Sequence, residues 1–335
     1  MLRSRTTPAL AALLLPGILL GRTLSGQQPT SVSTETPEVH LLARTIQEEV
    51  EVIRWHMGRP VETRTLIPVE DVTIRENFRQ AMTLWRKINQ LGVELVGGGE
   101  PSPPVSAPRD GIYGPEHVRQ VLSSVLERLD EIKDATGLVG ATPIDRDAAA
   151  LNPDPDATPS DVFQVIVQCN RQVNRMLETQ SQPGDVFQRV QQATFYAAEI
   201  LSALDDPSPF PTTPAYQAGM TPSHVYGRLL EIFDRLGFVF GEVGLEMVSW
   251  ADDAYVVPES LTPSDVYDVA TLLLSELEYL HSRIPGARAP IEVAHPGRRW
   301  PSDVYQQAGI LRTQMTQTVS RVREMPELAE RIGSF

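Results

Sequence analysis

The chain has 335 residues, and its hydrophobic content of 41% and charged content of 21% are those of a globular protein. Its formal net charge of −14 argues against nucleic acid as a partner, because phosphate binding needs clustered Lys and Arg. The single cysteine, Cys169, excludes an intramolecular disulfide, so packing must supply the stability. Cys169 lies on an apolar helical stripe, which indicates a buried structural thiol.

The first predicted element is an export signal. Arg3 and Arg5 precede an apolar run over residues 9–20, and small residues over 23–26 follow it. This layout is typical of a secretory signal peptide over residues 1–26, although no Ala-x-Ala cleavage site is present. An uncleaved membrane anchor is the alternative. We therefore expect export to the periplasm or the extracellular space.

Amino-terminal sequencing of the purified protein tests this interpretation. The mature chain is expected to begin near residue 26, because a signal peptidase removes the apolar run. Recovery of Met1 or Leu2 at the amino terminus would show that the run is retained.

The letters TPSDVY at 262–267 return in close variants at 158–163, 183–187, 221–226 and 301–305. A threonine before proline is a good N-cap, and proline suits the first helical position. The aspartate three residues after the cap can reach back to the backbone of the cap. Each copy therefore predicts the start of a helix.

An apolar stripe follows every copy of this motif. After TPSDVY it comprises Val266, Ala270, Leu273, Leu277 and Leu280, which share one face of a helix. Stripes of the same spacing begin at residues 39, 74, 118, 162, 186, 225, 266 and 304. The predicted fold class is all-α, with eight amphipathic helices and no alternating strand pattern.

The eight stripes divide into two sets of four. Their first residues are 35 to 44 positions apart, except for one separation of 24 in the middle. We therefore predict an internal duplication with a linker over 27–35, tandem four-helix units at 36–180 and 183–325, and a tail over 326–335. A continuous helical solenoid is the alternative. Long proline-rich segments join most helices, and each is long enough to run back along a helix and place its neighbours in parallel.

Signatures of chemistry are sparse. The sequence has no nucleotide-binding glycine motif, no HExxH and no GxSxG. Glu278 and His281 form a single ExxH pair, whereas a di-metal bundle needs two. Asn152, Asp154 and Asp156 match the start of a calcium loop whose later ligands are missing. We predict no cofactor, no metal and no catalytic residue.

Aromatic side chains form the candidate interaction surface. A Tyr or Phe follows the first valine of each motif copy, and the apolar segment 238–261 adds further aromatics. The candidate residues are Trp250, Tyr255, Tyr226, Tyr267 and Tyr305. One predicted function is a non-enzymatic scaffold or accessory subunit that docks on a larger protein assembly, such as a membrane-associated complex. The other is a carrier or sensor that binds a small molecule between helices near these aromatics.

Overall fold

The computed structural model describes residues 35–325 with gaps, together with 327 and 332. The gaps are 65, 67, 99–102, 107, 109–111, 139, 141–152, 251–256 and 326. The predicted signal peptide over 1–26 therefore lies outside the described residues, as do Tyr255 and Asn152.

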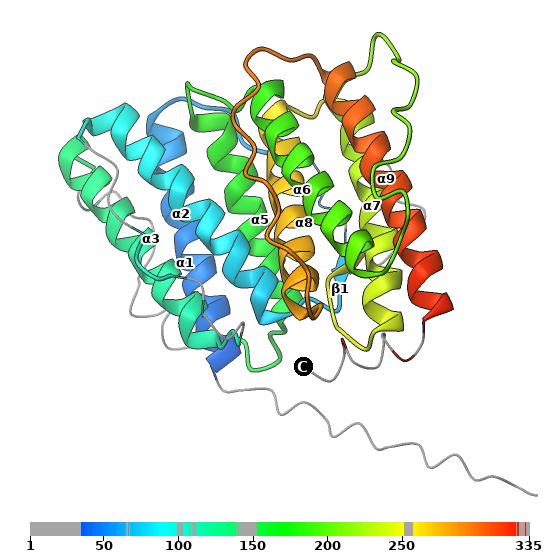
Figure 1. Ribbon diagram of the computed structural model, residues 1–335. Helices are drawn as coiled ribbons and strands as arrows, with labels where there is room; N and C mark the ends of the chain where they lie inside the picture. The colour runs from blue at the N-terminus through cyan, green and yellow to red at the C-terminus, as the bar shows by residue number, and fades with distance from the viewer. Residues whose placement is uncertain are drawn as a thin grey trace, which may run out of the picture. The chain divides into compact units, whose positions relative to one another are not determined.

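Helices dominate the described part of the chain, which confirms the all-α fold class (Figure 1). In six of the eight described helices the first residue is a proline. The helices are α1 (Glu35–His56), α2 (Ile74–Val96), α3 (Pro115–Thr136), α5 (Pro159–Met176), α6 (Pro183–Ala203), α7 (Pro222–Glu242), α8 (Pro263–Arg283) and α9 (Pro301–Glu324).

Two short strands depart from the expectation of a strand-free chain. β1 (Val69–Glu70) and β2 (Ser249–Trp250) pair antiparallel, with Val69 opposite Trp250. A strand of two residues is too short to display the alternation by which strands are found in a sequence. The pair joins two connections that lie far apart along the chain.

Side-chain caps explain where the helices begin. At the start of α8, Thr262 N donates to Asp265 Oδ2 at 2.8 Å, and Asp265 N donates to Thr262 Oγ1 at 3.4 Å. In α3 and α7, Nδ1 of His117 and His224 replaces the aspartate and accepts from the backbone N–H of the cap residue at 3.0 and 3.1 Å. Each cap satisfies a backbone donor that the first helical turn leaves free.

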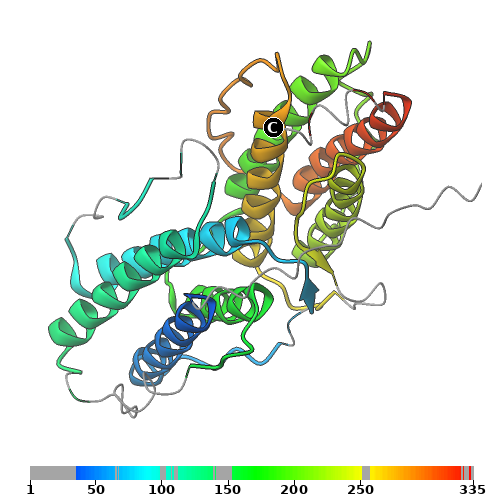
Figure 2. The same ribbon diagram turned by 90° about the horizontal axis from the view of Figure 1, so that it is seen from below.

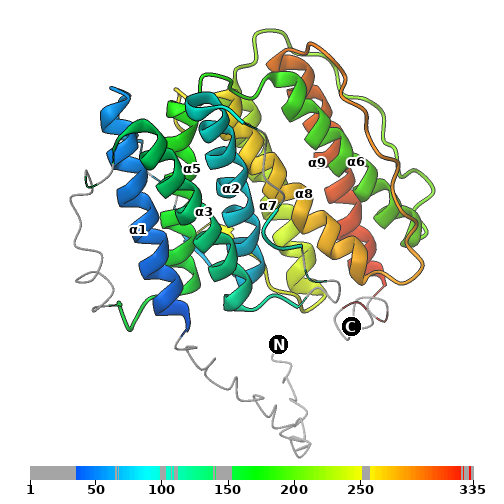
Figure 3. The same cartoon turned by 90° about the vertical axis from the view of Figure 1, so that its left-hand side faces the viewer.

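The helices form two groups (Figures 2 and 3), and each group packs around its own apolar core. One core belongs to the first helix group, α1, α2, α3 and α5, and the other to the second helix group, α6, α7, α8 and α9. Within each group the first two helices both contact the last two, so the neighbours correspond. This correspondence favours an internal duplication, which stays a prediction. Residues Thr34–Phe335 form one compact unit in which the two groups meet.

The four helices of the second group run in parallel, because their first turns gather at one place. The first proline and the first valine of each helix line a small apolar opening there: Pro183, Val186, Pro222, Val225, Pro263, Val266, Pro301 and Val304. Parallel helices need connections that return along the full helix length, which accounts for the long proline-rich segments.

Glutamine side chains hold these returning segments. Gln188 Nε2 of α6 donates to Val293 O at 2.7 Å, and Gln192 Nε2 donates to Ile291 O at 3.1 Å. Because the later helix residue contacts the earlier segment residue, segment 284–299 runs opposite to α6. Glutamines of α9 hold the segment before α7 in the same way. An amide side chain suits this role, since it can satisfy backbone groups that lack strand partners.

Candidate functional site

The two helix groups meet where α2 and α5 lie against α8. Arg75, near the start of α2, contacts Glu276 in the second half of α8 at 2.6 Å. Lys87, further along α2, contacts Asp268 near the start of α8, also at 2.6 Å. The two helices therefore run in opposite directions, and charged side chains form much of their contact.

A cavity of about 50 Å³ lies at this junction, lined by residues of α2, α5, α7, α8 and both strands. Its wall is largely apolar and includes three aromatic side chains, Phe163, Tyr226 and Trp250. About 10–15 Å³ of such space is enough for one water molecule. The cavity therefore has room for a few waters, or for the head group of a small ligand.

Two of the five candidate aromatics line this cavity. Tyr226 is buried there, and Trp250 packs edge-on against Phe233 with ring centroids 5.6 Å apart. Tyr267 and Tyr305 are not among the lining residues. The structure thus brings together Tyr226 and Trp250 from the candidate surface and leaves Tyr267 and Tyr305 outside the cavity lining.

Tyr267 and Tyr305 instead join neighbouring helices of the second group. Arg189 of α6 donates to the Tyr267 hydroxyl at 2.8 Å from Nη2 and 3.0 Å from Nε. Arg228 of α7 lies 3.5 Å from the centroid of the Tyr305 ring and donates to its hydroxyl. Both tyrosines are half-buried, so each contributes packing, a hydrogen bond and a cation–π contact.

Asp268, on the floor of the cavity, belongs to a buried ion pair. Lys87 Nζ and Asn174 Nδ2 both donate to Asp268 Oδ2, at 2.6 and 3.1 Å. Burial raises the pKa of Asp268 and lowers the pKa of Lys87, although the charge of each partner opposes the shift of the other. The floor therefore holds opposite charges away from bulk water.

A second ion pair lies beside the first. Arg64 Nη1 donates to Asp265 Oδ2 at 2.8 Å, and Arg64 Nη2 donates to Glu62 Oε2 at 2.5 Å. Burial alone would raise the pKa of Asp265, but hydrogen bonds from Arg64 and Thr262 outweigh it and the pKa lies below its usual value. Asp265 thus caps α8 and also ties the segment after α1 to the second group.

The motif aspartates Asp265 and Asp303 consequently differ in what their replacement should cost. Asp265→Asn should lower the free energy of unfolding by about 2 kcal/mol or more, because the buried Arg64 loses a charged partner. Asp303→Asn, at an outward-facing cap, should cost under about 1 kcal/mol. Urea unfolding of the two variants measures both values, and equal losses would contradict the special role of Asp265.

Three buried side-chain atoms of the lining residues lack a hydrogen-bond partner. They are Asp268 Oδ1, Asn170 Oδ1 and Trp250 Nε1. The orientation of the Asn170 amide is set by its nitrogen, which donates to the backbone oxygen of Gln80 at 3.2 Å. Buried polar atoms are nearly always paired, so unpaired atoms around one cavity point to water or a ligand.

The motif copies differ in sequence at one residue of this site. The residue after the motif aromatic is glutamine in three copies, at 164, 188 and 306, but it is Asp268 in α8. Such a change from amide to carboxylate can be read in the sequence. Its partners Lys87 and Asn174 could not be found in this way, because they lie on other helices.

Cys169, Glu278 and His281, the other candidates for reactive or metal-binding side chains, lie outside the cavity lining. Burial raises the pKa of the Cys169 thiol to about 12, so this thiol stays protonated near neutral pH. Glu278 Oε2 lies 3.8 Å from Arg79, and His281 Nε2 contacts the backbone oxygen of Arg288 at 2.8 Å. Within the described ranges no group of three or more His, Cys, Asp or Glu side chains is arranged to hold a metal ion.

Comparison with known proteins does not identify a function for this chain. No family model, curated protein or solved structure matches this chain. Of the helices that the structure describes, none combines the length and the apolar character needed to cross a membrane.

Proposed function

We propose that this chain is an exported, non-enzymatic protein that binds a small molecule in the cavity between its two helix groups. The observation that carries the proposal is the coincidence of an aromatic wall with three unpartnered buried polar atoms. A ligand in this place would satisfy those atoms and cover the apolar wall.

The location supports the same function. Ligand sites often lie between packed units, because two separately folded surfaces leave space where they meet. Here α5 supplies Phe163 and Asn170, whereas α7 and α8 supply Tyr226 and Asp268. A bound molecule would contact both groups and could therefore report its presence through their relative packing.

A cavity-filling variant tests the proposal. Val167 of α5 lines the cavity, and Val167→Phe puts a larger side chain at this position. Val165→Phe is the matched control, because Val165 lies on the same helix, is also half-buried and packs against the first core. Native mass spectrometry of the full chain from its source, and thermal-shift screening with small molecules, should detect a ligand for the wild type and Val165→Phe only. Equal binding by all three proteins would refute the site.

The scaffold function is the second candidate, and a different observation favours it. Two proline-rich segments of the second helix group carry large apolar side chains that are more than half exposed: Phe210, Tyr216, Ile291 and Trp300. Exposed aromatic residues of this kind often serve as anchors in protein interfaces. The segments themselves offer extended backbone that a partner can contact.

Variants that lack the exposed aromatic side chains test the scaffold function, because they should no longer bind the partner protein. The double variant Phe210→Ser, Trp300→Ser removes two exposed anchors, while Trp55→Ser removes an equally exposed side chain on α1. Chemical crosslinking in the native membrane and soluble fractions should yield one defined complex for the wild type and for Trp55→Ser. The same complex in the double variant would exclude this surface.

A further inference from the structure

We infer that the cavity selects a primary amine, whose ammonium group donates hydrogen bonds to Asp268 Oδ1 and Asn170 Oδ1. The inference rests on the proposed small-molecule function and specifies the chemical class of the ligand. It follows from the kinds of polar atom that are left without a partner.

The unpartnered atoms favour a donor over an acceptor. Two of them, on Asp268 and Asn170, accept hydrogen bonds, and only Trp250 Nε1 donates. Asp268 is 9% exposed and Asn170 is 1% exposed, so neither obtains its partner from bulk water at little cost. A ligand with several N–H groups matches this set better than a carboxylate or phosphate does.

The neighbouring cations do not reverse this preference. Lys87 and Arg64 already hold the other oxygen atoms of the floor, through Asp268 Oδ2 and Asp265. Arg171, which also lines the cavity, is hydrogen-bonded to the side chain of Tyr226. An anionic ligand would therefore have to break existing pairs, whereas an ammonium group would use oxygens that are free of partners.

Lys87 shows that this floor accepts an ammonium group. Its Nζ lies 2.6 Å from Asp268 Oδ2 and 3.4 Å from the backbone oxygen of Asn170. The same two residues thus already surround one ammonium from the side of α2. The second carboxylate oxygen of Asp268 and the amide oxygen of Asn170 are the acceptors that remain for a ligand.

The size and the wall of the cavity limit the rest of the ligand. A volume of about 50 Å³ admits an ammonium group on a short alkyl chain, not a drug-sized molecule. The aromatic rings of Phe163, Tyr226 and Trp250 suit a short alkyl chain next to a cation. Water alone would satisfy the oxygens but would leave this apolar wall poorly solvated.

Access requires a small rearrangement. Solvent does not reach Asp268 Oδ1 or Asn170 Oδ1 in the structure. A ligand at these atoms therefore needs side chains of the cavity wall to rotate. Such rotations are common when a small ligand enters a site.

Three probes of equal length test the inference: n-propylamine, 1-propanol and propionate. Each is titrated by NMR into the full chain and into the Val167→Phe and Val165→Phe variants. We expect the amine to bind about 10-fold or more tightly than the alcohol, as charge-assisted hydrogen bonds predict, and propionate to bind weakest. Val167→Phe should abolish the binding of the amine, and Val165→Phe should retain it.

The outcomes distinguish the preference for an amine from the proposal that the cavity binds a small molecule. Equal affinity for amine and alcohol, or tightest binding of propionate, would overturn the amine preference but leave the cavity as a ligand site. Failure of all three probes to bind would also overturn the amine preference. The thermal-shift screen with small molecules tests the proposed function independently. Binding that persists in Val167→Phe would place the probes outside the cavity and refute both.

Discussion

Arg75→Met is expected to lower the free energy of unfolding by about 3–5 kcal/mol near neutral pH. Arg75 is buried between the two helix groups, and its guanidinium donates to Glu276 at 2.6 Å and to the backbone oxygen of Glu246 at 3.0 Å. It also lies 4.0 Å from the centroid of the Tyr279 ring. Methionine retains much of the packing but leaves the Glu276 carboxylate buried without its counter-charge, which is the costly part of the change.

The pH dependence of this loss identifies its cause. Burial and the charge of Glu276 raise the pKa of Glu76 to about 7, and burial raises the pKa of Glu276, while Arg75 opposes both shifts. Without Arg75 both pKa values should rise further. A carboxyl whose pKa is higher in the folded state adds stability as the pH falls toward its unfolded value. The difference between wild type and variant should therefore shrink from about pH 8 to about pH 5.

Other titrating groups do not affect the difference in unfolding free energy between the wild type and Arg75→Met. Burial lowers the pKa of His40, whose effect on stability has the opposite sign in part of this range, since its unfolded form takes up the proton first. Because His40 is unchanged in the variant, its contribution cancels in the difference. Urea unfolding at several pH values supplies the required free energies.

Arg79→Met is the matched control for Arg75→Met. Arg79 lies one turn later on α2, and its pair with Glu278 is longer, at 3.8 Å, and partly exposed on both sides. Such a pair contributes at most about 1 kcal/mol. If the two variants lost equal stability, or if the loss in Arg75→Met did not vary with pH, a buried uncompensated carboxylate would not be the reason.

Local patterns in the sequence predicted the helices well. Val266, Ala270, Leu273, Leu277 and Leu280 were placed on one buried face, and each is at most 2% exposed. The signal is strong because a helix repeats its buried face every three or four residues and because proline and a capping residue mark its start. These cues lie within one element, so no knowledge of the partner helix is needed.

Contacts between distant residues were not predictable in the same way. Arg75 and Glu276 are 201 positions apart, and each resembles an ordinary surface charge in its own helix. Gly184, where other motif copies have serine, is explained only by the fold, because a Cβ there would collide with the backbone oxygen of Gly297. The glutamines that hold the returning segments are likewise unremarkable until those segments are in place. The cavity depends on such contacts, so its composition emerges only from the structure.

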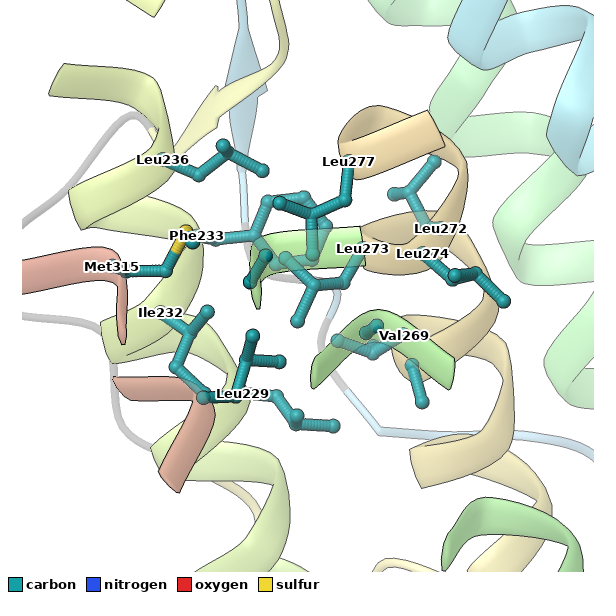
Figure 4. Packing of buried hydrophobic residues seen from close by; sticks show 14 of the residues in the cluster. Leu229, Ile232, Phe233, Leu236, Val269, Leu272, Leu273, Leu274, Leu277 and Met315 are labelled. Atoms are coloured by element: carbon teal, nitrogen blue, oxygen red, sulfur yellow. The ribbon is translucent and has the colours of Figure 1, made fainter. Parts of the chain in front are cut away.

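Leu277→Ala is expected to cost about 2–5 kcal/mol. Leu277 is completely buried in the second core, where residues of α7 and α9 such as Phe233 and Met315 also lie (Figure 4). Truncation removes apolar contacts and leaves a space that the surrounding helices can fill only in part. The backbone of α8 is unaffected, because alanine favours the helix at least as well as leucine does.

Glu278→Ala is the control, because it changes the next residue on the same helix. The Glu278 side chain is 34% exposed and its ion pair with Arg79 spans 3.8 Å, so its loss should cost under about 1 kcal/mol. Chemical unfolding of both variants gives the two values under one set of conditions. A large loss for Leu277→Ala beside a small one for Glu278→Ala places the buried face of α8 where the apolar stripe predicts it. Comparable losses would mean that α8 is rotated about its axis, and the junction with α2 would then have to be rebuilt, since Asp268 and Glu276 are positioned by the same rotation.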